Sequence, residues 1–151
     1  MAASRFDHAN IVVADMDAAL RFYTEVVGLT RGFEGTLEGP WIDAVTGQSA
    51  VLARCVFVES PGQDFRLELL QYICPAARAF ADNSLPQVPG IRHLAFTVSD
   101  MDAFYRHAVE MGTEFVSSPV DVPFLLPGGR RKRLCYFHDP DGTLLEAAEY
   151  S

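Results

Sequence analysis

The chain has 151 residues and carries 12 Lys and Arg against 20 Asp and Glu, a formal net charge of −8. A hydrophobic fraction of 49% and a charged fraction of 21% are typical of a globular domain and exclude a disordered chain. The negative charge argues against nucleic acid or an anionic membrane as partner, because both bind concentrated positive surfaces. With no membrane-length apolar run and no secretory signal at the N-terminus, the sequence predicts a cytoplasmic protein.

The first half of the chain predicts a strand, a helix and a hairpin. Phe6–Val13 is apolar and β-branched, as strands are. Asp15 is a suitable N-cap for a helix whose apolar residues recur at helical spacing until Gly28 ends it. A loop is then expected over Gly32–Gly47, followed by a hairpin of strands Ala50–Glu59 and Phe65–Tyr72.

The second half repeats the first. Aligning His8 with His93 places HANIVVADMDAALRFYTEVVG over HLAFTVSDMDAFYRHAVEMG, and aligning Glu68 with Glu146 places VFVESPGQDFRLELLQY over LCYFHDPDGTLLEAAEY. The copy predicts a strand over Ile91–Val98, a helix between Asp100 and Gly112, and a hairpin of Arg133–His138 and Thr143–Tyr150. We therefore predict one α+β domain of two modules, residues 5–74 and 90–151, linked by a loop over Pro75–Pro89.

Each of four predicted strands carries one titratable side chain on the face directed away from its helix, because alternate residues of a strand share a face. Ile11 and Val13 would face the first helix, and Leu94, Phe96 and Val98 the second. A carboxylate among apolar strand residues is costly to bury without a partner, and a divalent cation compensates two carboxylates and two imidazoles together. Such mixed ligands suit Zn²⁺, Ni²⁺, Fe²⁺, Co²⁺ or Mn²⁺, so we expect a metal site of His8, Glu68, His93 and Glu146.

The three cysteines, Cys55, Cys74 and Cys135, are odd in number and form no CxxC motif. One interpretation is small buried hydrophobic residues in a reducing cytosol, and the other is a catalytic thiol. No His stands next to any of them in the sequence, which favours the first interpretation.

The motifs FDHANIVVADMDAALRFYTEVVGL, RLELLQY, IRHLAFTVSDMDAF and DPDGTLLEAAEY resemble the vicinal oxygen chelate superfamily, which includes glyoxalase I, methylmalonyl-CoA epimerase, extradiol dioxygenases and resistance proteins. The resemblance covers nearly the whole chain. It implies two paired βαβββ modules forming a cupped mixed sheet, a metal bound by His8, Glu68, His93 and Glu146, a small-molecule substrate and a homodimer.

The same resemblance implies an isomerase, epimerase or lyase that moves a proton next to a metal-bound carbonyl, with Glu146 as the base and Glu68 as its possible partner. Val12 and Tyr72 stand where glyoxalase I would bind glutathione, which disfavours that enzyme. A dioxygenase would use His8, His93 and Glu146 as its three metal ligands, and Glu68 would then be an additional carboxylate that such enzymes do not usually use as a ligand. A drug- or metabolite-binding protein of the same fold would not need the four ligands.

One basic cluster, GGRRKR over Gly128–Arg133, stands out in this acidic chain. It is either a loop that clamps an anionic group of the substrate or a solvated hairpin with ordinary charge pairs. The sequence leaves these two interpretations open.

Overall fold

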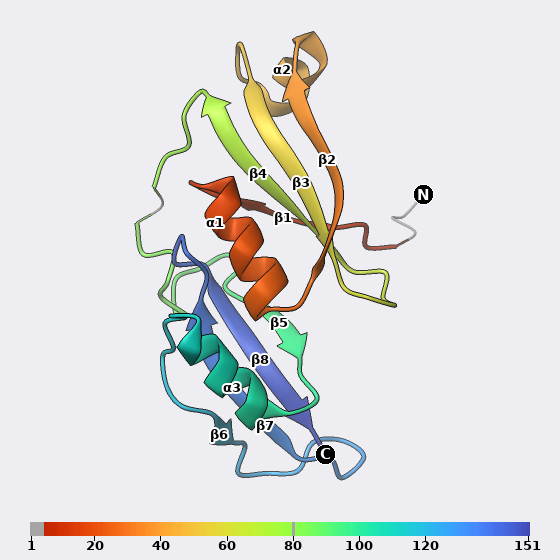
Figure 1. The fold of residues 1–151 in the computed structure, drawn as a ribbon, viewed down its shortest axis with the longest axis vertical. Helices are drawn as coiled ribbons and strands as arrows, with labels where there is room; N and C mark the ends of the chain where they lie inside the picture. Colours follow the sequence, from red (N-terminus) through yellow and green to blue (C-terminus); the bar gives the residue numbers. More distant parts are fainter. Residues whose placement is uncertain (1–4, 80) are drawn as a thin grey trace. The chain divides into compact units, whose positions relative to one another are not determined.

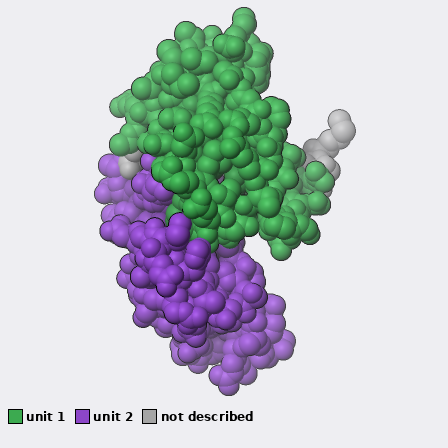
Figure 2. All heavy atoms as spheres, in the orientation of Figure 1, with its two compact units in different colours: residues 1–79 green, residues 80–151 purple. Residues whose placement is uncertain are grey.

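The structure, a computed structural model, describes residues 5–79 and 81–151. The chain divides into two compact units, residues 1–79 and residues 80–151 (Figure 2). The predicted modules, residues 5–74 and 90–151, lie one in each unit. No helix among the described residues is long and apolar enough to cross a membrane.

The first unit is a four-stranded mixed sheet with helices (Figure 1). Its strand order is β1-β4-β3-β2, in which β1 runs parallel to β4 and the other neighbours are antiparallel. The elements are β1 (Ala9–Val12), α1 (Met16–Arg21), the π-helical turn η1 (Phe22–Val26), β2 (Thr30–Glu38), α2 (Pro40–Thr46), β3 (Leu52–Glu59) and β4 (Arg66–Cys74).

The second unit repeats this arrangement, with a shorter edge strand and, among its described residues, no second helix. Its strand order is β5-β8-β7-β6, and β5 runs parallel to β8. The elements are β5 (Leu94–Thr97), α3 (Met101–Glu110), β6 (Val120–Asp121), β7 (Lys132–His138) and β8 (Leu144–Tyr150). The α+β class with two βαβββ modules is therefore confirmed.

The predicted faces of the first strand of each module are also confirmed. Ile11 and Val13 are buried, whereas Val12 between them is 46% exposed. In β5, Leu94 and Phe96 are half-buried, and His93 before them is exposed. Both strands are shorter than predicted, because pairing with the neighbouring strand begins only at Ala9 and Leu94.

The loop predicted over Gly32–Gly47 is wrong, because most of this segment forms β2 and α2. β2 is an edge strand whose side chains are almost all exposed, so it lacks the apolar alternation by which a strand is recognised in a sequence. Its backbone is held by antiparallel pairing with β3 instead. α2 has Pro40 in its first turn, where proline's fixed φ suits a helix.

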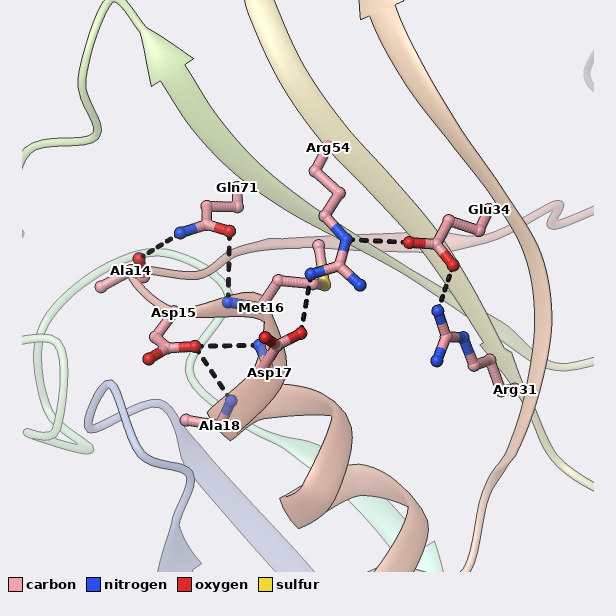
Figure 3. Close-up of polar contacts among 9 residues, drawn as sticks. All are labelled: Ala14, Asp15, Met16, Asp17, Ala18, Arg31, Glu34, Arg54 and Gln71. Atoms are coloured by element: carbon pink, nitrogen blue, oxygen red, sulfur yellow. Dashed lines mark hydrogen bonds and ion pairs between the residues drawn. The ribbon is translucent and has the colours of Figure 1, made fainter.

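Both predicted N-caps are confirmed. Asp15 accepts the backbone N–H groups of Asp17 and Ala18 at 2.9 and 3.0 Å (Figure 3). Asp100 accepts that of Ala103 at 2.9 Å. Beyond them, Gly28 and Gly112 take φ of +83° and +81°, which suits their predicted place after a helix.

Side chains from the sheet secure the turn into α1. Gln71 of β4 donates to the carbonyl of Ala14 and accepts the N–H of Met16, at 2.9 and 3.4 Å (Figure 3). Arg54 of β3 donates to Asp17 at the start of the helix and to Glu34 of β2, at 2.7 and 2.8 Å. Hydrogen bonds thus connect the junction between β1 and α1 with β4 and β3, and through Arg54 with β2.

We expect Asp15→Ala to lower the free energy of unfolding by about 0.5–2 kcal/mol, because two backbone N–H groups lose their acceptor. Asp15→Asn should lie close to the wild type, since asparagine caps helices about as well as aspartate. Urea unfolding followed by circular dichroism measures the difference. Equal midpoints for Asp15→Ala and the wild type would contradict this role.

Candidate metal centre

The parallel pairing of β1 with β4 brings His8 beside Glu68. Asn10 lies opposite Glu68 in the register, and His8 precedes it by two residues on the same side of the strand. The His8 Nε2 atom lies 3.4 Å from Glu68 Oε2. We call these two residues the first His–Glu pair.

The second unit builds the same pair at the equivalent place. Ala95 lies opposite Glu146, and His93 Nε2 lies 3.6 Å from Glu146 Oε2. The Glu146 side chain is only 6% exposed, while that of His93 is 37% exposed. We call these two residues the second His–Glu pair.

An aromatic ring from the neighbouring strand lies beside each histidine. Phe57 stands opposite Glu68, and Tyr136 stands opposite Glu146. Their rings lie 5.5 Å from the His8 ring and 5.2 Å from the His93 ring, measured between centroids. These contacts restrict how each imidazole can turn.

Asp7 orients the imidazole of His8. His8 Nδ1 lies 2.7 Å from Asp7 Oδ2, and Arg66 donates to the other oxygen of Asp7 at 2.9 Å. The hydrogen bond from His8, followed by the charge of Arg66, lowers the pKa of Asp7, so this carboxylate is an acceptor at neutral pH. Nδ1 of His8 therefore donates a hydrogen bond to Asp7, and Nε2 is directed to Glu68. Histidine ligands of metals are commonly oriented in this way.

The two pairs fit a divalent cation. In each pair, an imidazole nitrogen faces a carboxylate oxygen. Two acceptor atoms repel each other at this distance unless a proton or a cation lies between them. Ligands held about 2.1 Å from one metal ion, at tetrahedral or octahedral angles, lie about 3.0–3.5 Å apart, close to both observed distances. Among the described residues no three His, Cys, Asp or Glu side chains gather as a complete site, so each unit offers two ligands of the expected four.

The two carboxylates have different partners. Glu68 accepts Asn10 Nδ2 at 3.0 Å and the thiol of Cys55 at 3.5 Å, both of them neutral groups. Glu146 instead accepts Lys132 Nζ at 2.6 Å. Burial disfavours the charged form of Lys132, but the hydrogen bond and the charge of Glu146 outweigh it and raise the pKa of the lysine. Lys132 is therefore an ammonium group at neutral pH.

Sequence reasoning missed Asp7 and Lys132 as members of these sites. Asp7 directly precedes a candidate ligand, but neighbours in a strand usually point to opposite faces. Lys132 was noted only as part of the basic cluster. Its spacing of four residues places it on one face of β7 with Tyr136, but only the register of β7 with β8 shows that Glu146 lies on that face.

Residues 5–147 match the family model described as "Glyoxalase/Bleomycin resistance protein/Dioxygenase superfamily". The chain belongs to this superfamily. It is 30% identical to the uncharacterized protein YaeR of Escherichia coli over 142 residues, which are 94% of this chain and 93% of YaeR. It is 28% identical to a 2-epi-5-epi-valiolone epimerase of Actinomyces sp. over 144 residues, which are 92% of this chain and 75% of the epimerase.

A solved structure shares the fold across almost the whole chain. The glyoxalase family protein from Bacillus cereus superimposes with a TM-score of 0.85 at 27% identity, covering 99% of this chain and 96% of that protein. The family match and the structural match thus both extend over nearly all of the given sequence.

The two buried thiols do not support cysteine catalysis in this superfamily member. The three cysteines are free, and Cys55 and Cys135 are buried. Burial raises the pKa of Cys55 to about 12, with a further contribution from the charge of Glu68, and raises that of Cys135 to about 11. Both remain protonated at neutral pH, and a thiol is a weak nucleophile in that form.

We expect one thiol of the native protein, that of the exposed Cys74, to react quickly with a disulfide reagent at pH 8. Cys55 and Cys135 should react only after denaturation, because they are buried and protonated. The absorbance of the chromophore released from the reagent, read before and after guanidinium chloride is added, gives the number of reactive thiols per chain. Cys74→Ser is the control and should abolish the fast phase. Three thiols reacting at similar rates in the native protein would contradict it.

Proposed function

We propose that this protein is a divalent-metal-dependent isomerase, epimerase or lyase that moves a proton next to a carbonyl group of a small acid or thioester. His8, Glu68, His93 and Glu146 would hold the metal ion, which is Zn²⁺, Ni²⁺, Co²⁺, Fe²⁺ or Mn²⁺. When bound, such an ion acts as a Lewis acid that stabilises negative charge on a substrate oxygen.

One observation carries the proposal. Two His–Glu pairs, at equivalent positions of a duplicated module, each keep a nitrogen and an oxygen at the spacing of two ligands on one cation. The proposal adds that the two pairs share a single ion, which then has four ligands. The valiolone epimerase relative supports proton-transfer chemistry on this fold.

The carboxylates are the groups suited to move the proton. Glu146 would accept the proton from the carbon next to the substrate's carbonyl, and Glu68 would donate or accept on the other side. A carboxylate bound to a cation is a poor base, so Glu146 would serve as the base only when a metal ion does not hold its carboxylate. Its place on β8, close behind the turn over 139–143, suits a small movement.

Asp7 would support the reaction indirectly. Its hydrogen bond fixes the proton of His8 on Nδ1 and holds Nε2 in the direction of Glu68. Asp7 is therefore a positioning residue. A cytoplasmic location and a homodimer belong to the same proposal, as does a small molecule as substrate.

We expect the purified protein to hold one divalent ion per chain, and His8→Ala and His93→Ala each to weaken its binding by about 100-fold or more, because each removes one of four ligands. Elemental analysis with equilibrium dialysis measures both. His107→Ala, on α3, is the matched control and should keep the ion. Loss of metal in only one of the two ligand variants would show that the pairs do not share an ion.

We expect Glu146→Gln to retain the metal, more weakly, and to slow proton exchange by about 10²–10⁴-fold, because an amide cannot serve as the base. Deuterium incorporation into a panel of α-acidic carbonyl acids and acyl-CoAs, followed by mass spectrometry, measures it. Glu149→Gln is the matched control, since Glu149 lies three residues further along the same strand and on its opposite face.

Oxygen uptake and metal content separate the other functions of the superfamily. A ring-cleaving dioxygenase would consume oxygen when it is given an aromatic diol. If Glu146→Gln turned over at the normal rate while oxygen was consumed, the dioxygenase function would replace the proposed one. A protein that binds its ligand without metal and exchanges no proton would be a binding protein.

A further inference from the structure

We propose that Lys132 and Arg130 form an anion-binding subsite beside Glu146, which binds a carboxylate or phosphate group carried by the substrate itself. The substrate would then be an anionic carbonyl compound. This inference rests on the proposed function only for the identity of the ligand as substrate, because the subsite is built from residues of the second unit alone.

Lys132 lies on the same sheet face as Glu146. It pairs with Tyr150 in the register of β7 and β8, while Tyr136, four residues later, pairs with Glu146. Residues separated by an even number along a strand share a face, so these four side chains lie on one side of the sheet. The Lys132 side chain is 19% exposed, and its ammonium group already binds a carboxylate oxygen at 2.6 Å. A second anionic oxygen would meet the same donor.

Arg130 adds a second cation at the same ring. Its guanidinium carbon lies 5.1 Å from the centroid of the Tyr150 ring, and Lys132 Nζ lies 5.6 Å from it. Among residues 5–79 and 81–151, Arg130 forms no ion pair, whereas the nearby Arg133 is paired with Asp102 at 2.8 Å. Lys132 therefore holds the one carboxylate contact at this ring, and Arg130 beside it has none among the described residues.

The first unit lacks this arrangement. The residue opposite Tyr72, which is the counterpart of Tyr150, is Ala53. Neutral groups, Asn10 and Cys55, contact Glu68 instead. An anionic substrate would therefore be held in one orientation, with its charged group at the second unit.

Occupation of Glu146 by a cation strengthens the case for an anion. A carboxylate shared with a divalent ion no longer neutralises Lys132 fully. Two positive side chains and a metal ion would then lie close together, which is unfavourable without a further negative group. A bidentate carboxylate or phosphate supplies that charge and suits the planar guanidinium of Arg130.

The test uses the full chain freed of metal, with oxalate as the probe, by isothermal titration calorimetry at low salt. Glu146→Gln removes the carboxylate that occupies Lys132, so it should bind oxalate about 10-fold more tightly than the metal-free wild type. Adding Lys132→Met to Glu146→Gln should abolish the gain. Adding Arg130→Gln should remove a large part of it, and adding Lys132→Arg should keep it.

Arg131→Gln in the Glu146→Gln background is the matched control. It removes one positive charge from the adjacent, exposed residue, and it should leave the oxalate affinity within about twofold. Circular dichroism confirms that each variant is folded, and Arg130 is exposed, so its replacement has little reason to disturb the core.

Two results would overturn the subsite: no gain in affinity for Glu146→Gln, or an equal gain after Lys132→Met. Because this comparison needs no metal, it decides the subsite independently of the proposed function. If the wild type binds no divalent ion and the oxalate pattern still appears, the metal chemistry fails and the subsite stands.

Discussion

The parallel pairing of a four-residue strand with the last strand of its own module is the constraint on which the rest depends. In β1–β4 and β5–β8 this register decides that a histidine and a glutamate stand together on one face and that the apolar residues point to the other. A slip of one residue would exchange the two faces, burying both histidines and exposing Ile11. The burial of Ile11 and Val13 therefore also fixes the position of the first His–Glu pair.

The two pairs are alike in geometry and different in charge. Around the first lie an orienting carboxylate that is itself paired with Arg66, an amide and a thiol, and around the second lies an ammonium group in direct contact with the glutamate. Arg92 precedes His93 where Asp7 precedes His8. Within the part of the chain that the structure describes, Glu68 therefore has only neutral groups as hydrogen-bond donors, whereas Glu146 is paired with a lysine, and the two glutamates differ in the charge beside them.

How much the sequence reveals depends on whether a feature leaves a periodic or repeated pattern. The two helix caps, the central strands and the four candidate ligands recur at equivalent positions, and each was found in that way. β2 was not predicted, because the side chains of this edge strand are exposed and show no apolar alternation. Its backbone pairing with β3 holds it in place instead. Lys132 was not predicted as a neighbour of Glu146, because that contact depends on the register between two strands, which no local sequence pattern shows. Whether all four ligands meet at one ion stays a prediction.

The differences around Tyr72 and Tyr150 follow from having both modules in one polypeptide. An assembly of two identical single-module chains would repeat every substitution, so an ammonium group beside one glutamate would appear beside the other. Fusion removes that symmetry and lets Ala53 and Lys132 differ. Each module can then change the residues around its own His–Glu pair independently, which two copies of an identical chain cannot do.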